Sequence, residues 1–268
     1  MRSLPLLITL ALVSGCDSLA ARMQAQEGVR LYRAGKVVEA AAKFEEAEKL
    51  DPYIPAVQLN LAFANLAVYQ SGPATPVGKE AAKKSINGLI RYLHLRPNEE
   101  RAMSYLVQAF IDTGNYDAAV IYFRPRTDAN PPDGEAIGIL GTIASKTGRH
   151  DEARRWLERR VTVEPNNMDA RLSLSVLLWD YLKQHPGLLA AERLSIANTA
   201  LQHLELVMKE KPNAPSAFTY TNLVYRERAL GQPDAVSKEA DLAKAREYHQ
   251  KATALQKGAV TSSGKGGN

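Results

Sequence analysis

The sequence predicts an all-α fold built from about six tandem antiparallel helix pairs. Prolines follow apolar helical phrases at separations of 45, 34, 34 and 47 residues, at Pro52, Pro97, Pro131, Pro165 and Pro212. Glycines recur at one register between the two helices of a pair, at Gly35, Gly114 and Gly148. A period of this length is typical of stacked helical repeats, because proline stops a helix and glycine can cap one.

Composition places the chain among folded proteins and narrows its chemistry. Of its 268 residues, 45% are hydrophobic and 24% are charged, which excludes wholesale disorder. The single cysteine excludes an intramolecular disulfide framework and a cysteine-cluster metal site. Five dispersed histidines and the absence of a helical histidine pair indicate no metal and no other cofactor. The net charge of +5 is spread along the chain, and it gives little support to nucleic-acid binding.

Inside the repeats, small and large residues recur at matching positions. Small residues would let the two helices of a pair approach closely, as at Gly28, Ala40, Gly141 and Ala153. Large residues would fill the space between the helices, as at Leu31, Phe44, Phe110 and Phe123. One such pair cannot bury its apolar face alone, so we expect the pairs to stack.

This pattern resembles the tetratricopeptide repeat (TPR), strongly in the first, third and fourth repeats and moderately in the second, fifth and sixth. The resemblance implies a right-handed superhelical solenoid over residues 21–257, with insertions in repeats 2, 5 and 6. The insertions are placed around residues 71–76, around residues 185–187, and in a long last helix. Residues 258–268 are small and polar, and they are predicted to form a disordered tail.

The segment before the repeats is predicted to be a targeting signal. Arg2 precedes an apolar run from Leu4 to Val13, and this run is too short to span a bilayer. The four residues that end at Cys16, the only cysteine, resemble a bacterial lipobox. The resemblance implies a signal peptide at 1–15, diacylglyceryl and acyl (palmitate) chains on Cys16, and a short tether at 16–20. An ordinary secretory signal with a chance cysteine is the alternative.

The lipobox implies a bacterial cell-envelope protein that is lipid-anchored and faces the periplasm. Asp17 follows the lipidated position, and in enteric bacteria an aspartate there retains a lipoprotein in the inner membrane. Other lineages sort lipoproteins by different rules, so inner and outer membrane both stay open.

No catalytic motif occurs in the sequence, and we expect no enzyme. Carboxylate pairs are adjacent in the chain, so on a helix they point in different directions and cannot form an acid–base pair. The basic run at residues 154–160 allows two interpretations. It could bind an acidic partner or anionic lipid, or it could be the solvated face of a second helix.

The TPR resemblance implies that the first helix of each pair lines a concave groove for a partner. An extended or helical peptide anchored on aromatic side chains would suit this surface. Ala25 and Val29 stand where chaperone-binding TPR domains carry charged clamp residues, so that specificity is not expected. The predicted partner-binding residues are Tyr32, Leu59, Phe63, Arg101, Gln108, Trp179, Leu223 and Arg226.

The sequence therefore predicts a lipid-anchored scaffold that binds one or more envelope proteins. It predicts neither nucleic acid nor a small-molecule substrate as a ligand. TPR lipoproteins of the pilotin type and the barrel-assembly type have similar layouts. An assembly factor for a type IV pilus or secretion secretin is accordingly the alternative function, and a cell-wall enzyme is disfavoured.

Overall fold

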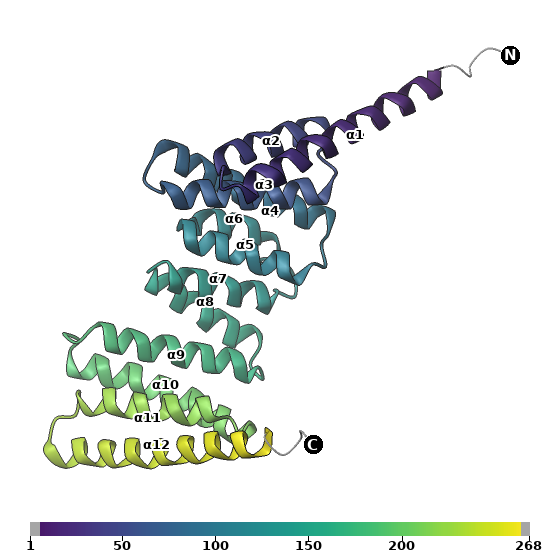
Figure 1. The fold of residues 1–268 in the computed structure, drawn as a ribbon. Helices are drawn as coiled ribbons and strands as arrows, with labels where there is room; N and C mark the ends of the chain where they lie inside the picture. The colour runs from purple at the N-terminus through teal and green to yellow at the C-terminus, as the bar shows by residue number, and fades with distance from the viewer. Residues whose placement is uncertain (1–5, 264–268) are drawn as a thin grey trace. The chain divides into compact units, whose positions relative to one another are not determined.

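The computed structural model describes residues 6–263, with side chains from residue 17 to residue 257. Every regular element in this range is an α-helix, and no strand occurs among these residues (Figure 1). The all-α prediction is thereby confirmed. Among the described residues, no helix combines the length and apolar character needed to cross a membrane.

The chain divides into two compact units, Met1–Ala119 and Val120–Asn268. The first unit holds α1 (Leu6–Arg33), α2 (Val37–Leu50), α3 (Pro55–Ser71), α4 (Pro76–Leu95) and α5 (Glu100–Thr113). Helix α6 (Tyr116–Thr127) begins in the first unit and ends in the second. The second unit continues with α7 (Gly134–Lys146), α8 (His150–Val163), α9 (Met168–Gln184), α10 (Ala190–Glu210), α11 (Pro215–Ala229) and α12 (Ala235–Ser263).

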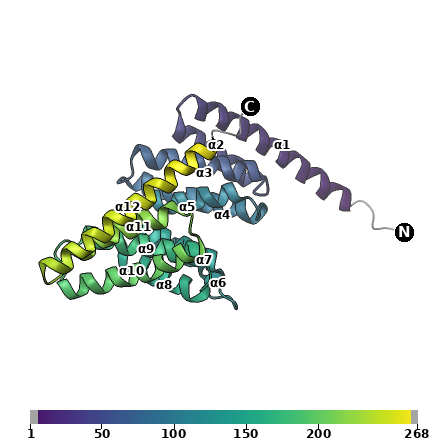
Figure 2. The same cartoon turned by 90° about the horizontal axis from the view of Figure 1, so that it is seen from below.

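Within each unit, helices that are consecutive in the chain pack as pairs. In the first unit, α1 packs on α2 and α3 on α4, and α2 also contacts α3. In the second unit the pairs are α7 with α8, α9 with α10, and α11 with α12. Figure 2 shows the N-terminal half of α1 projecting beyond the helices against which α1 packs.

The glycines that the sequence placed between paired helices do cap the first helix. Gly35, Gly114 and Gly148 have φ values of 76°, 65° and 76°. The next residue in each case donates its N–H to a carbonyl in the last turn, as Asn115 does to Phe110 at 3.0 Å. Residues other than glycine rarely adopt this left-handed backbone conformation. Glycine is therefore required at the position that follows the first helix of these pairs.

Most of the periodic prolines also act as predicted. Helices α2, α4, α8 and α10 each end two residues before a proline of the series, at Pro52, Pro97, Pro165 and Pro212. The residue before a proline is disfavoured in the helical region, so the helix must stop there. Pro131 differs, because α6 already ends at Thr127.

The extra residues of the degenerate repeats lengthen helices and do not form long loops. Helices α3, α4, α9 and α10 hold 17, 20, 17 and 21 residues, whereas α7 and α8 hold 13 and 14. Only the short turns around 72–75 and 185–189 remain outside them. Each added helical residue gains a backbone hydrogen bond at little cost once the helix is nucleated, so lengthening is the favoured outcome.

Helix lengthening also makes two boundaries differ from those that the sequence predicted. The segment 16–20 lies within α1, where the sequence predicted a tether, and Ala21 that follows is fully buried. Helix α12 continues to Ser263, past the predicted start of the tail at 258. Neither stretch contains a proline to stop the helix. Residues 1–5 and 264–268 lie outside the described residues.

Small and large residues meet across the helix pairs. A methyl group added at Gly28 would lie 2.8 Å from Cε1 of Phe44, whose side chain is almost fully buried. Around this contact, Leu31, Ala40, Leu61 and other apolar residues form the core of the first unit. The close approach of α1 and α2 therefore depends on glycine at position 28.

Candidate functional site

A groove between α1 and α3 opens on the side formed by the first helices of the repeats, and we call it the α1–α3 groove. It encloses about 560 Å³. Its lining is apolar (Ala25, Val29, Ile54, Ala56, Val57), cationic (Arg22, Arg30, Arg33) or amide-bearing (Gln26, Asn60). The helical spacing of Arg22, Gln26, Val29 and Arg33 places these residues on one face of α1. An apolar floor with a cationic rim can hold an amphipathic ligand.

A smaller cavity of about 140 Å³ adjoins this groove, and we call it the aromatic notch. It shares three residues with the groove and adds three aromatic rings, so its lining is Val29, Arg33, Asn60, Tyr32, Phe44 and Phe63. Phe63 also meets Tyr105 of α5 edge to face, with ring centroids 5.1 Å apart. The aromatic surface thus extends from α1 over α3 to α5 within the first unit.

The second unit has its own groove, between α7 and α9, which encloses about 460 Å³. Trp179 lies on its wall, and this ring meets Tyr220 of α11 edge to face at 5.5 Å. Thr142, Leu172 and Val176 also line this α7–α9 groove. Its charges are mixed, since the lining includes Lys146, Arg160 and Asp180.

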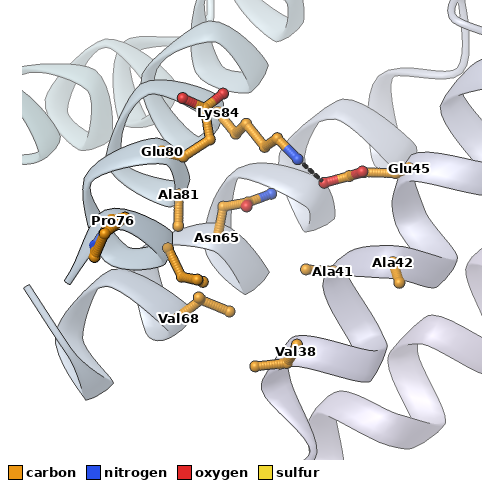
Figure 3. Close-up of a pocket in the computed structure, with 11 residues that line it drawn as sticks. Val38, Ala41, Ala42, Glu45, Asn65, Val68, Pro76, Glu80, Ala81 and Lys84 are labelled. Carbon is orange, nitrogen blue, oxygen red and sulfur yellow. Dashed lines mark hydrogen bonds and ion pairs between the residues drawn. The ribbon is translucent and has the colours of Figure 1, made fainter.

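A further hollow lies between α2 and α4, the second helices of their pairs. Figure 3 shows Val38, Ala41 and Ala42 of α2 facing Val68 of α3 and Ala81 of α4 across this α2–α4 hollow. It encloses about 450 Å³. Lys84 spans its rim with a 2.6 Å ion pair to Glu45. This surface was not predicted from the sequence.

Three of the predicted partner-binding residues line a groove or notch. Tyr32 and Phe63 lie together in the aromatic notch, and Trp179 lines the α7–α9 groove. Tyr32 is 41% exposed, which leaves its ring accessible to a partner. All three are aromatic, and rigid aromatic side chains at partly exposed positions are suited to anchor a bound segment.

The other five predicted residues lie on first helices but outside these cavities. Leu59 and Leu223 are half-buried, which is typical of packing residues. Arg101, Gln108 and Arg226 are exposed, and the last two bind within their own helices. Gln108 donates to Asp112 at 2.6 Å, and Arg226 donates to Asn222 at 3.0 Å. Their role in partner binding stays a prediction.

Among the residues of the α1–α3 groove that sequence reasoning missed, four are polar. These are Gln26, Arg30, Arg33 and Asn60. The first three follow Arg22 at helical spacing and could have been read as one face of α1. Val57 of α3 is almost fully buried, Val29 of α1 is half-buried, and both line the groove. The groove beside this face of α1 therefore arises only from the tertiary packing of the helices.

The basic run at 154–160 is tied down within the protein. Arg154 pairs with Glu158 at 2.8 Å, and Arg160 pairs with Glu164 at 3.0 Å. Arg159 donates to the carbonyl oxygen of Thr127 at 2.6 Å. These partners favour the interpretation as a helix face over that as a docking patch.

Two histidines from different repeats come closer than the sequence indicated. The rings of His150 and His185 are 6.2 Å apart, and His185 stacks on Tyr181. Among the described residues, no group of three or more histidine, cysteine, aspartate or glutamate side chains could hold a metal. The pair therefore packs two helix ends together and does not form a recognisable metal site.

His203 should make the stability of the second unit depend on pH. Burial, and then the positive charge of Arg171, lower the pKa of His203 from its ordinary value of 6.5. The folded state disfavours the protonated form of His203. The contribution of the neutral imidazole to stability is therefore fully present above pH 6.5, and it is lost as the pH falls through the folded pKa. We expect denaturant midpoints to fall from about pH 8 to about pH 5, and His203→Gln to reduce that fall. An unchanged pH profile in the variant would contradict this assignment.

Tandem helix pairs with grooves along their first helices define an α-helical repeat protein. Residues 134–167, which form α7, α8 and the turn to α9, match the family model described as tetratricopeptide repeat. The chain is also 35% identical over 57 residues to Cellulose synthase operon protein C of Komagataeibacter xylinus. That match covers 21% of this chain and 4% of the relative, so the chain spans only a small part of it.

Solved structures with similar arrangements share little sequence with the chain. MamA from Desulfovibrio magneticus RS-1 is 18% identical, with a TM-score of 0.37 over 72% of this chain and 96% of the other. YrrB, described as a TPR protein with an unusual peptide-binding site, is 16% identical, with a TM-score of 0.34 over 87% and 90%. A human IFIT1 dimer with PPP-AAAA is 18% identical, with a TM-score of 0.46 over 87% and 50%.

Residues 134–167 of the chain therefore form a tetratricopeptide repeat. Repeats of this kind are typical of protein–protein interaction scaffolds that bind peptide or protein partners. Such repeats are typically non-catalytic.

Proposed function

We propose that this protein is a lipid-anchored scaffold of the bacterial cell envelope that holds an envelope protein in the grooves of its first helices. The observation that carries the proposal is the α1–α3 groove with its adjoining aromatic notch. The accessible rings of Tyr32 and Phe63 lie beside a groove that encloses about 560 Å³ and has an apolar floor. Aromatic anchors in a preformed groove are what an extended or helical peptide needs for binding.

The anchor is inferred from the lipobox that ends at Cys16. Acyl chains on its sulfur would hold the protein at a periplasmic membrane surface, at about 0.8 kcal/mol for each buried methylene. Helix α1 then leads without interruption from position 16 to Arg33, so the α1–α3 groove would stand within a few helical turns of the lipid. A partner in the envelope would meet the groove close to the membrane.

The proposal has two parts, and one experiment on cells tests both. Cys16→Ser should move the protein from the membrane fraction to the soluble fraction. A photo-crosslinking residue at Phe63 should give a discrete covalent adduct with an envelope protein. The same crosslinker at Lys83, which is exposed on α4 away from the groove, is the matched control.

The outcomes separate the parts of the proposal. Membrane retention of the Cys16→Ser variant would remove the lipid anchor and leave the scaffold. Equal adducts from positions 63 and 83, or none from either, would remove the groove as the binding surface. Identification of the adduct as a secretin subunit would establish the pilotin-like alternative.

A further inference from the structure

The charged residues that line the α1–α3 groove are all cationic. Three arginines line it, and no carboxylate does. Arg30 is neutralised by Glu27 on the same helix at 2.6 Å, which lowers the pKa of that carboxyl. Arg22 and Arg33 are exposed, and neither has an ion pair within the described part of the chain. Two uncompensated cations therefore stand at the edge of an apolar floor.

Other hollows of the protein differ in this respect. The rim of the α2–α4 hollow carries Glu45 and Glu80 beside Lys84. In the α7–α9 groove, Arg160 is bound to Glu164 at 3.0 Å, and Asp180 is part of the lining. Charge thus distinguishes the α1–α3 groove from surfaces of similar size.

The spacing of the cations matches an extended chain. Arg22 and Arg33 are about 16 Å apart along α1 at 1.5 Å per residue. About five residues of extended peptide span the same length. The side-chain amides of Gln26 and Asn60 also line the groove, and they have no hydrogen-bond partner among the described residues. A peptide backbone could satisfy these amides while its carboxylates meet the arginines.

The aromatic notch adds a side-chain requirement. It encloses about 140 Å³ beside Arg33 and Asn60, and its walls include the rings of Tyr32 and Phe63. A cavity of this size and lining accepts a single aromatic or large apolar side chain. A lipid headgroup would use the arginines but not the notch, so the combination favours a peptide.

We propose that the α1–α3 groove binds an acidic, extended segment of the partner protein, with carboxylates at Arg22 and Arg33 and one aromatic side chain in the aromatic notch. The proposal rests on the proposed function and specifies the chemistry of the partner. It implies that recognition weakens with salt, because the rim charges are exposed.

Fluorescence anisotropy on the full chain in detergent micelles tests the proposal. The probe is a labelled Gly-Glu-Asp-Phe-Glu-Asp-Gly peptide, compared with one in which glutamine and asparagine replace the acids and one in which alanine replaces Phe. We expect each change in the peptide to weaken binding by about tenfold or more. Equal binding of the neutral peptide would overturn the proposal.

Two charge-reversal variants separate the groove from net charge. Arg22→Glu with Arg33→Glu should raise the Kd for the acidic probe by about tenfold or more. Lys79→Glu with Lys83→Glu, both exposed on α4, makes the same change in net charge outside the groove and should stay within about twofold. Equal losses in both variants would show long-range attraction only, and they would overturn the proposal. Circular dichroism of each variant confirms that it is folded.

Two further arms distinguish the alternatives. If anionic phosphatidylglycerol vesicles bind the wild type but not the Arg22→Glu/Arg33→Glu variant, and the peptide binds neither, the groove is a headgroup site and the proposal fails. If the partner adduct from position 63 persists undiminished in the same variant, the scaffold function stands and the acidic-segment proposal fails.

Discussion

Replacing Gly141 by leucine is expected to lower the free energy of unfolding of the second unit by about 3 kcal/mol. A Cβ at this position would lie 2.7 Å from Cδ2 and 2.9 Å from Cγ of Leu157 on α8. Leu157 is only 5% exposed, so displacing it breaks the contacts that it makes with its neighbours. Leucine adds three more carbons beyond that Cβ, and α7 and α8 must separate to accommodate them. Urea denaturation followed by circular dichroism measures the loss.

The chain offers both a control and a compensating change. Gly187 has ordinary backbone angles and nothing within 4 Å of an added Cβ, so Gly187→Leu should change stability by less than about 0.5 kcal/mol. Leu157→Ala leaves a void that Gly141→Ala can partly fill. The double variant should therefore be more stable than the sum of the two single losses implies. Strict additivity would show that the two positions do not press on each other, contrary to the structure.

The same contact shows what a sequence pattern can predict. Gly141 belongs to the repeated small residues that predicted a close approach of paired helices, and Leu157 is the α8 side chain that it meets. The left-handed glycines, such as Gly114, were predictable for a similar reason, because a conformation that only glycine tolerates leaves a direct mark on the sequence. Local rules of this kind determine most of the fold.

Helix lengths and the chemistry of the grooves were harder to predict from the sequence. A turn sequence such as that at 72–75 marks where helices break, but it does not say whether extra residues extend the helix or the loop. Tyr32, Phe63 and Trp179 could be predicted because they stand at the positions that the tetratricopeptide resemblance assigns to the groove. Exposed residues such as Arg33 are common on any helix, and their grouping with Asn60 of α3 arises only when α1 and α3 pack together.

Arg193 was not predicted from the sequence, and it lies at the centre of a buried network of hydrogen bonds. Its side chain is 3% exposed on α10, and it donates to Glu227 of α11 at 2.7 Å, across 34 residues of sequence. It also donates to the carbonyl oxygens of Leu182 and His185 at 3.3 and 2.8 Å. These carbonyls belong to the C-terminal end of α9, where helix geometry supplies no donor. One guanidinium therefore joins three helices.

Arg193→Met should cost about 3–5 kcal/mol, because it leaves the Glu227 carboxylate and the α9 carbonyls without a buried donor. Arg193→Lys should also destabilise, since an ammonium on a flexible stem cannot reproduce the fixed fork of a guanidinium. The matched control is Arg246→Met, which breaks an ion pair with Glu239 that is 58% and 63% exposed and should cost less than about 1 kcal/mol.

A double-mutant cycle then separates the ion pair from the helix cap. Arg193→Met combined with Glu227→Met removes both charges, so the part of the loss that comes from an unpaired carboxylate should be recovered. The part that comes from the carbonyls of Leu182 and His185 should persist, since methionine donates no hydrogen bond. Full recovery in the double variant would mean that the end of α9 gains nothing from Arg193. A loss equal to that of Arg246→Met would mean that the buried network contributes no more than a surface pair. The expected result lies between these limits, with the double variant still less stable than the wild type by about 1–3 kcal/mol.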